Sequence, residues 1–580
     1  MAVDGESEHL ARNNIDSASF SADREAQISD VVATAKRGGW ITFPFIAGTI
    51  MGMQLSNNGW SANLIVYLIQ EFNISSIKAA DIANVVNGCT LLFPVVGGII
   101  ADSFSGSFTV VSTSTFASLL GIILLTLTAS LDSLRPQRCE ILGSSCDTPS
   151  TAQYTILYGG IALSCIGIGG ARFTLSTMGA NQFDKPEHQG IFFNWFFIVY
   201  YAASVISTTI FVYVEDNVSW TVGFGLCVAA NFAAFVIFLL GKRFYRHDKP
   251  QGSPFLALAR VIVATILKWK VVLSSRTEDY YQENNATINA VPTTLNKNFR
   301  FLNRAAFKIE GDIGEDGSIA KPWRLCSVQQ VEDLKTLIKL FPLWSSSLML
   351  SITIGVQSSM TVLQALTMDR HLGPHFKIPA GSILVIVFFA SSVSLTLIDR
   401  LVCPLWQKLT RRTLTPLQKT GVGHIFTVAS MIVAALIEKK RLKIAHNHQL
   451  QDQLGSIVPM LSVWLFPQLI LAGIGEAFYL PGQISLYYEE FPVSLRSTAT
   501  GMIALILGIG FYLSTALTDI VGDVTTWLPD NINSGKLDNF YWTLAALCAV
   551  NFGYYLVCSC LYKYRNVNKG LDGNSGSLGE

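Results

Sequence analysis

Long apolar runs, separated by short polar segments, are the main feature of the sequence. A helix needs about 20 predominantly apolar residues to cross the hydrocarbon core of a bilayer. The candidate runs cover residues 40–69, 82–101, 115–131, 154–173, 191–214 and 221–240, and then residues 340–360, 382–398, 421–437, 460–480, 498–517 and 540–564. The pattern predicts an all-α membrane protein with twelve transmembrane helices in two six-helix bundles.

The polar segments divide the chain into five parts. Neither terminus has an apolar run of its own, so a cleaved signal peptide is excluded and both ends are expected to be disordered. The predicted parts are an N-terminal tail over 1–38, a six-helix bundle over 39–241, a basic central loop over 242–335, a second bundle over 336–565 and a C-terminal tail over 566–580.

The first apolar run is interrupted by a polar patch at residues 54–58 (Gln-Leu-Ser-Asn-Asn). Lipid cannot solvate such groups. We therefore expect residues 40–69 to form one helix with an inward-facing polar stripe.

Composition excludes several classes of protein. Of 580 residues, 50% are hydrophobic and 14% are charged, with a mean hydropathy of +0.41. Soluble domains carry about 25% charged residues. The net charge of +1 gives no attraction to nucleic acid. The sequence has no phosphate-binding Gly-rich loop, no metal-ligand cluster and no nucleophile motif, so we expect neither an enzyme nor an ATP-driven pump, with no cofactor and no metal.

The distribution of Lys and Arg predicts the orientation. Basic clusters at residues 36–37, 242–308, 400–419 and 563–565 all fall on one side of the membrane if both termini are cytosolic. One segment disagrees, because the charged run 438–443 would then be an outer loop.

Two local features stay open at this stage. Cys139 and Cys146 share a predicted outer loop, where they form either a disulfide or two free thiols. Residues 254–272 form an amphipathic stretch that is either an interfacial helix on the cytosolic leaflet or a solvated linker helix.

Four motifs carry a resemblance to a known family. They are the loop Gly97-Gly98-Ile99-Ile100-Ala101-Asp102-Ser103-Phe104-Ser105-Gly106, the stretch from Gly167 through Arg172 to Asp184, the run Phe192-Phe193-Asn194-Trp195-Phe196-Phe197, and the stretch from Gly473 through Glu476 and Gln483 to Glu489. The first, with Asp102 and Gly106, resembles the loop between helices two and three of major facilitator proteins. The others resemble the proton-dependent oligopeptide and nitrate transporter family in its plant form. The resemblance implies a substrate site between two bundles.

The first helix departs from the family pattern. The charged Glu-x-x-Glu-Lys/Arg motif of the family falls here on Ile50, Met53 and Gln54. Buried charges of this kind usually mark proton or substrate pathways. Without them the first helix cannot supply a titratable group for proton coupling, and we expect the three positions to line the space where coupling groups would otherwise sit.

The fourth and tenth helices retain one charge each. The lysine of the family is Arg172 here, which keeps its proton when buried and suits a planar oxyanion. Glu476 matches the acid of the tenth helix. Either the two residues pair and brace the helices, or they bind and gate an anion; the two roles are compatible.

Further cavity positions follow from the resemblance. Gly355 stands where a nitrate-binding histidine occurs in the family, and Ser485 stands where relatives carry an acid. His424 is read as a packing residue rather than a proton relay. Three aromatic residues are either cavity walls or packing: Tyr67, Trp195 and Trp344.

The lost first-helix motif resembles one subgroup in particular, the nitrate excretion transporters. The resemblance implies passive or weakly proton-coupled efflux of nitrate, with chloride as a second substrate, across the plasma membrane rather than the vacuolar membrane. The alternatives are a proton-coupled importer of nitrate, peptide or another organic solute, and a non-transporting anion sensor or accessory subunit. The expected partners are a small inorganic anion and the lipid bilayer. Regulation by a kinase and the oligomeric state are left open.

Overall fold

The chain folds into two helical bundles joined by a central segment. The computed structural model describes residues 38–137, 148–246, 252, 254–274, 276–282, 299–314, 319–374, 376–451, 453, 455–491 and 499–562. Cys139 and Cys146, both terminal tails and part of the central segment lie outside these residues.

The described first half contains eight α-helices that pack as six membrane spans. The helices are α2 (Phe43–Ala62), α3 (Leu64–Phe72), α4 (Ser76–Ile100), α5 (Ser107–Ser130), α6 (Thr151–Ala180), α7 (Pro186–Ile206), α8 (Val212–Asn217) and α9 (Trp220–Leu240). Two of the spans consist of two helices joined end to end, α2 with α3 and α7 with α8.

The second half follows the same plan after α10 (Pro254–Leu267) in the central segment. Its elements are α11 (Val328–Leu366), α12 (Val385–Leu397), α13 (Cys403–Thr410), α14 (Pro416–Asn447), α15 (Phe466–Glu490), α16 (Ala499–Val524), α17 (Leu537–Leu561) and the parallel pair β1 (Met368–Asp369) and β2 (Val458–Leu461).

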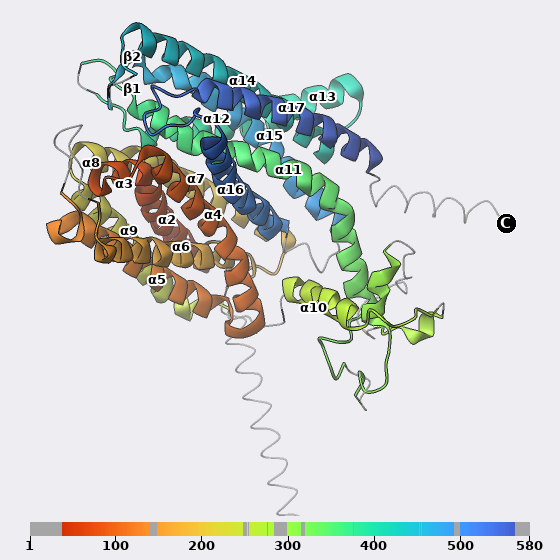
Figure 1. Cartoon of the computed structure of the whole chain (residues 1–580). Coiled ribbons are helices and arrows are strands. Elements are labelled where there is room, and N and C mark those ends of the chain that lie inside the picture. Colours follow the sequence, from red (N-terminus) through yellow and green to blue (C-terminus); the bar gives the residue numbers. More distant parts are fainter. Residues whose placement is uncertain are drawn as a thin grey trace, which may run out of the picture.

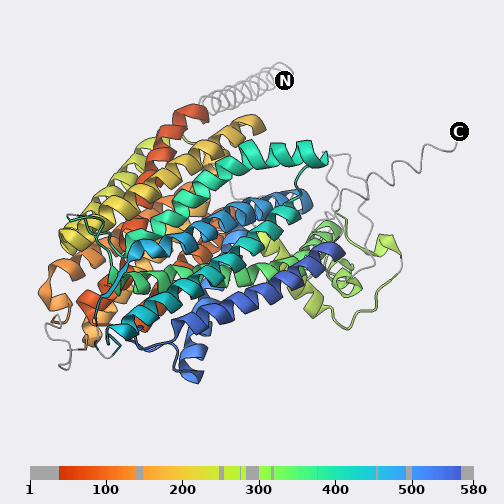
Figure 2. The same cartoon turned by 90° about the horizontal axis from the view of Figure 1, so that it is seen from above.

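The molecule has two distinct ends. Figure 1 shows α10 and the central segment at one end of the bundles and β1 with β2 at the opposite end. The view from above shows the central segment again at one end of the long helices (Figure 2). We call the end that carries α10 the inner face and the opposite end the outer face.

Eleven of the twelve predicted spans coincide with long apolar helices, whereas residues 40–69, expected to form one helix, form the two helices α2 and α3. Eleven helical segments of the described chain are long and apolar enough to cross a membrane. The twelfth span is α2 with α3, whose polar patch lowers its hydropathy. Asn63, with φ −106° and ψ 7°, separates these two helices.

Two boundaries were predicted wrongly. α11 begins at Val328, so the second bundle starts inside the predicted central loop 242–335. α14 continues to Asn447, so the charged run 438–443 is the end of a membrane helix and not an outer loop. In both cases charged residues were taken as loop, although they extend a helix beyond the lipid or into a buried contact.

The apolar core differs between the two faces. Near the outer face one continuous cluster joins both halves and includes Phe72, Val86, Ile383 and Leu465. Near the inner face each half has a cluster of its own, one around Ile50 and Phe192 and the other around Leu340, Tyr487 and Ile506. The halves are therefore sealed together at the outer face and packed separately toward the inner face.

The central segment has its own small core. Val261 and Ala264 of α10 are buried against the helical turn Arg300–Ala306 and the start of α11. The Lys268 Nζ and Asp312 Oδ2 atoms form a buried ion pair of 2.9 Å beside this core. α10 is thus docked on the protein through one face, while Ile262 and Ile266 are exposed on another.

Candidate functional site

Part of the polar stripe of α2 is hydrogen-bonded within the first half, whereas Asn57 Oδ1 is buried without a partner among the described residues. Gln54 is buried and donates hydrogen bonds to Asn58 Oδ1 at 3.0 Å and to Ser204 Oγ on α7 at 3.1 Å. The stripe therefore binds α2 to α7, as the internal satisfaction of polar groups in lipid requires.

Ile50 and Met53, two of the three first-helix positions at which a charged motif was expected from the resemblance, lie in the apolar core of the first half. Ile50 and Met53 are 1% and 2% exposed and belong to the inner apolar cluster of the first half. Thr115 of α5 donates to the sulfur of Met53 at 3.6 Å. In this state, therefore, Ile50 and Met53 pack in the apolar core and do not line an open cavity.

Arg172 on α6 is held by Tyr200 on α7. Its guanidinium donates a short hydrogen bond to the Tyr200 hydroxyl and lies 4.7 Å from the centroid of the same ring. Both contacts are with a neutral aromatic side chain. In the described part of the chain no carboxylate forms an ion pair with Arg172. Its positive charge is therefore not neutralised by an acid.

Glu476 on α15 belongs to a small polar cavity in the second half. The cavity is lined by Thr353 and Gln357 of α11, Ser430 of α14 and Tyr479 of α15, and its free volume is about 10 Å³. A space of this size holds about one water molecule. Glu476 is partly buried in a cavity lined by hydroxyl and amide side chains, and no described cation forms an ion pair with it.

Arg172 lies in the first half and Glu476 in the second. The hydroxyl of Tyr201 on α7 is within electrostatic reach of both groups. Nevertheless, no ion pair links them among the described residues. An ion pair that braces the two helices is therefore absent among the described residues in this state.

The outer face is closed by contacts that cross between the halves. Arg370 Nη1 lies 3.2 Å from Asp216 Oδ2, and these side chains are 9% and 8% exposed. Ser382 donates to the carbonyl of Thr208 at 2.6 Å. Gly381 packs so closely that a Cβ there would lie 2.4 Å from the Ala62 carbonyl oxygen. Polar, charged and steric contacts thus seal the same end.

Two of the predicted cavity residues are packing residues instead. Tyr67 is fully buried against Trp220 and Phe224, and its hydroxyl bonds with that of Thr128 at 2.9 Å. At Gly355 a Cβ would lie 2.5 Å from Ser514 Oγ on α16. Gly355 therefore faces a helix, and a histidine side chain at this position has no space.

The remaining predicted cavity residues do not surround Glu476. Trp344 packs edge-on against Tyr487 and Phe491 in the inner core of the second half. Trp195 on α7 is 51% exposed, and Ser485 on α15 is partly buried. Their roles in substrate binding stay predictions.

His424 is a packing residue, in agreement with its sequence interpretation. It is buried on α14, and its ring centroid lies 4.5 Å from that of Tyr555. Its Nε2 atom has no hydrogen-bond partner in the described part of the chain.

The loop motif after α4 is a turn at the inner face. Gly106 has a φ of 72°, which favours glycine, and α5 follows it. The carbonyl of Asp102 accepts a hydrogen bond from the Gly252 amide at 2.9 Å. Nearby, the Arg246 guanidinium contacts Asp184 at 2.5 Å and lowers the pKa of that carboxyl.

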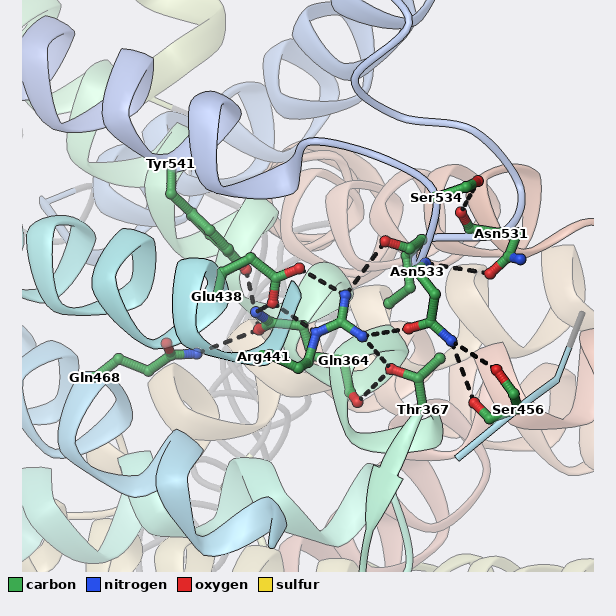
Figure 3. A network of polar contacts seen from close by, with 11 residues as sticks. Gln364, Thr367, Glu438, Arg441, Ser456, Gln468, Asn531, Asn533, Ser534 and Tyr541 are labelled. Atoms are coloured by element: carbon green, nitrogen blue, oxygen red, sulfur yellow. Dashed lines mark hydrogen bonds and ion pairs between the residues drawn. The ribbon is translucent and has the colours of Figure 1, made fainter. Parts of the chain in front are cut away.

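A buried charged network in the second half was missed by sequence reasoning. Arg441 Nη2 and Nε contact the two oxygens of Glu438 at 2.6 and 2.8 Å, and both side chains are 0% exposed. Gln364 donates to Glu438 at 2.7 Å, and Arg441 donates to Asn533 at 2.5 Å (Figure 3). The signal available in the sequence was the spacing of Glu438 and Arg441, which lie three residues apart on one helix and can therefore form an ion pair.

Comparison with known proteins agrees with this architecture. Two six-helix bundles that are sealed together at one end define a membrane transporter of the major facilitator type. The sequence profile of the POT family matches residues 108–534. The chain belongs to this family.

Its relatives span nearly the whole chain. NRT1/ PTR FAMILY 2.7 of Arabidopsis thaliana is 52% identical over 550 residues, which are 95% of this chain and 97% of that protein. NRT1/ PTR FAMILY 2.6 of the same plant is 51% identical over 551 residues, with 95% and 98% covered.

Solved structures share the fold. The POT family transporter PepTSo has a TM-score of 0.65 at 17% identity, covering 91% of this chain and all of that chain (100%). An auto-inhibited POT family peptide transporter has a TM-score of 0.64 at 16% identity, with 90% and 97% covered. The predicted fold class and family are confirmed.

Proposed function

We propose that this transporter carries a small inorganic anion, nitrate in the first place and chloride as a second substrate, mainly outward and without obligatory proton coupling. The observation that carries the proposal is Arg172, a permanent cation whose described partner is the neutral Tyr200. A planar guanidinium offers paired N–H donors to a planar oxyanion.

The first helix supports the uncoupled mode of transport. Ile50, Met53 and Gln54 are buried and carry no charge, so α2 offers no group that binds and releases a proton. With the cell interior negative, moving one anion outward releases about 2.3 kcal/mol per 100 mV. Voltage alone is therefore a sufficient driving force for efflux.

The direction and location belong to the same proposal. We place the inner face and both termini in the cytosol and the protein in the plasma membrane, because the Lys and Arg clusters gather at one face and the sequence resembles the nitrate excretion subgroup. An anion approaching from the cytosol then meets the end at which the halves pack separately.

One observation favours a second function. Glu476 lies beside Gln357 and Tyr479 in a cavity of the second half, where a carboxyl group can bind a proton. A proton-coupled importer of nitrate, a peptide or another organic solute would use this group as its coupling site.

Isotopic flux in proteoliposomes tests the proposal. Purified full-length protein should release labelled nitrate, and Arg172→Ala should lose about 10- to 100-fold in apparent affinity, because a hydrogen bond to a charged group contributes about 1.5–3 kcal/mol. Arg260→Ala is the matched control, since Arg260 lies outside the bundles over Trp323. Dipeptide transport without nitrate transport would overturn the proposal. Nitrate binding without flux would favour a sensor.

A further inference from the structure

One buried guanidinium joins three separate parts of the second half. Arg441 lies near the end of α14, and its Nε and Nη2 atoms donate to the two oxygens of Glu438 at 2.8 and 2.6 Å. Its Nη1 atom donates to Thr367 Oγ1 at 3.0 Å and to Asn533 Oδ1 at 2.5 Å (Figure 3). Its Nη2 atom also donates to the carbonyl of Ile532 at 3.2 Å. A guanidinium has five N–H donors, and all five are used.

Charge balance explains only two of these five hydrogen bonds. The two bonds to Glu438 neutralise the buried pair, in which both side chains are 0% exposed. The other three N–H groups bind uncharged oxygens on segments outside α14. A lysine would also neutralise Glu438, but its single ammonium nitrogen lacks the planar fork that reaches partners in several directions. Arg441 therefore holds segments of the chain together in addition to balancing a charge.

Two of those segments lead into the strand pair at the outer face. Thr367 directly precedes β1, and its carbonyl accepts a hydrogen bond from the Val458 amide of β2 at 2.8 Å. Asn533 Nδ2 donates to the carbonyl and the hydroxyl of Ser456 at 3.2 Å, two residues before β2. Arg441 thus binds next to the start of both strands.

Arg370 directly follows β1 and contacts the first half. Its Nη1 atom lies 3.2 Å from Asp216 Oδ2. Its backbone carbonyl accepts a hydrogen bond from the Ile378 amide at 2.9 Å. Only the two residues of β1 separate it from Thr367. The contacts of Thr367 therefore fix the backbone from which the Arg370 side chain reaches across the boundary.

We propose that Arg441 is a positioning residue for the outer gate, which we define as the contacts of Arg370 with Asp216 and of Ser382 with Thr208. By binding the segments before both strands, Arg441 sets where Arg370 meets its partner in the first half. The hydrogen bonds of Arg441 to described residues all lie within the second half. The network is therefore able to stay intact while the gate opens and closes.

The proposal goes beyond the proposed function and does not depend on the identity of the substrate. It assigns to a buried charge pair an effect on the equilibrium between the closed and the outward-open states. A purely structural role would lower the stability of the second half and leave that equilibrium unchanged. The two roles are therefore separable by measuring the gate and the stability in the same variants.

Thr367→Val tests the link without removing the buried charge pair, because valine has no oxygen to accept the Arg441 hydrogen bond. Spin labels attached through unnatural amino acids at Val218 and Val524, which are 66% and 78% exposed, report the separation of the halves at the outer face of the purified full-length protein. Changes along a coupled network shift an equilibrium about 2- to 30-fold. Thr367→Val should raise the ratio of open to closed molecules within this range.

Two single variants separate positioning from stability. Thr367→Ser keeps the hydroxyl and should restore the wild-type distances. Thr361→Val is the matched control, because Thr361 is buried on the same helix and accepts a hydrogen bond from Gln468 at 3.4 Å, away from the strands. It should change the melting temperature without moving the distances. Asn533→Ala, which removes the link to β2, should also open the gate and provides the result if Thr367→Val does not fold.

A double variant tests whether the effect passes through the gate. In Asp216→Asn the contact with Arg370 is already broken. Adding Thr367→Val to it should multiply the ratio of open to closed molecules by less than in the wild type, because both changes act on the same contact.

Two results would overturn the positioning role: unchanged distances in Thr367→Val, or an equal effect of Thr367→Val in the wild-type and Asp216→Asn backgrounds. A failure of the proposed function is distinguishable. Absence of nitrate flux together with altered distances in Thr367→Val would refute anion efflux and leave the role of Arg441 intact.

Discussion

Arg370 and Asp216 form an ion pair, 3.2 Å long, that joins the second half of the transporter to the first at the outer face. Arg370 directly follows β1, and Asp216 lies in the last turn of α8. Both side chains are nearly buried. The pair lies beside Ser382, which bonds to Thr208 across the same boundary.

Breaking this ion pair should open the outer face. Removing one partner of a buried pair costs about 3–5 kcal/mol because it leaves the other charge unpaired. In Arg370→Gln and Asp216→Asn we expect the closed state to lose population, measured as faster labelling of a cysteine introduced beside the pair. The exchange Asp216→Arg with Arg370→Asp should recover closure. Equal labelling in all four proteins would contradict the assignment.

Tyr200 should position Arg172 through both its hydroxyl and its ring. Tyr200→Phe removes a hydrogen bond to a charged group, which contributes about 1.5–3 kcal/mol, and Tyr200→Ala also removes the cation–π contact, which contributes about 0.5–2 kcal/mol. We expect the KM for nitrate to rise in the first variant and to rise further in the second, with kcat affected less. Identical KM values would show that Tyr200 does not position Arg172.

Gly355 should tolerate no side chain. A Cβ would lie 2.5 Å from Ser514 Oγ and 2.9 Å from Ser514 Cβ, and overpacking a core costs about 1–3 kcal/mol. Gly355→Ala should therefore lower the melting temperature of the purified protein, and Gly355→His should lower it further without improving nitrate binding. Adding Ser514→Gly should restore much of the loss in the alanine variant. No recovery in that double variant would place the clash elsewhere.

The Glu438–Arg441 network should stabilise the second half. Glu438→Gln leaves Arg441 buried without its anion, so unfolding should become easier by about 3–5 kcal/mol. Lys443→Ala is the matched control, because Lys443 is exposed on the same helix and its loss should change the melting temperature little. If both variants melted alike, the network would carry no stability of its own.

The sequence was sufficient to predict the bundles but not the contacts between them. Apolar runs identified the spans because a bilayer demands them of any helix that crosses it. The same reasoning took residues 438–443 for a loop, since charges were assumed to be in water, whereas Glu438 and Arg441 neutralise each other inside.

The candidate site was predicted in part. Arg172 and Glu476 stand out because charges within spans are rare, and the structure places one in each half without an ion pair between them. The contact of Tyr67 with Thr128, of Gly355 with Ser514 and of Asp216 with Arg370 depends on how distant helices pack. No local pattern in the sequence reports such contacts.

The central claim is that the transported anion moves without an obligatory proton, and the zero-current voltage of reconstituted protein tests it most directly. With a tenfold nitrate gradient and no pH gradient, the account predicts a voltage of about 59 mV, the value for a single charge. A pH gradient imposed without a nitrate gradient should then give no voltage, and Arg172→Ala should lower the apparent affinity of the nitrate current by about 10- to 100-fold. A voltage that follows the pH gradient, or nitrate flux that carries no current, would contradict the account and make Glu476 the proton-coupling residue.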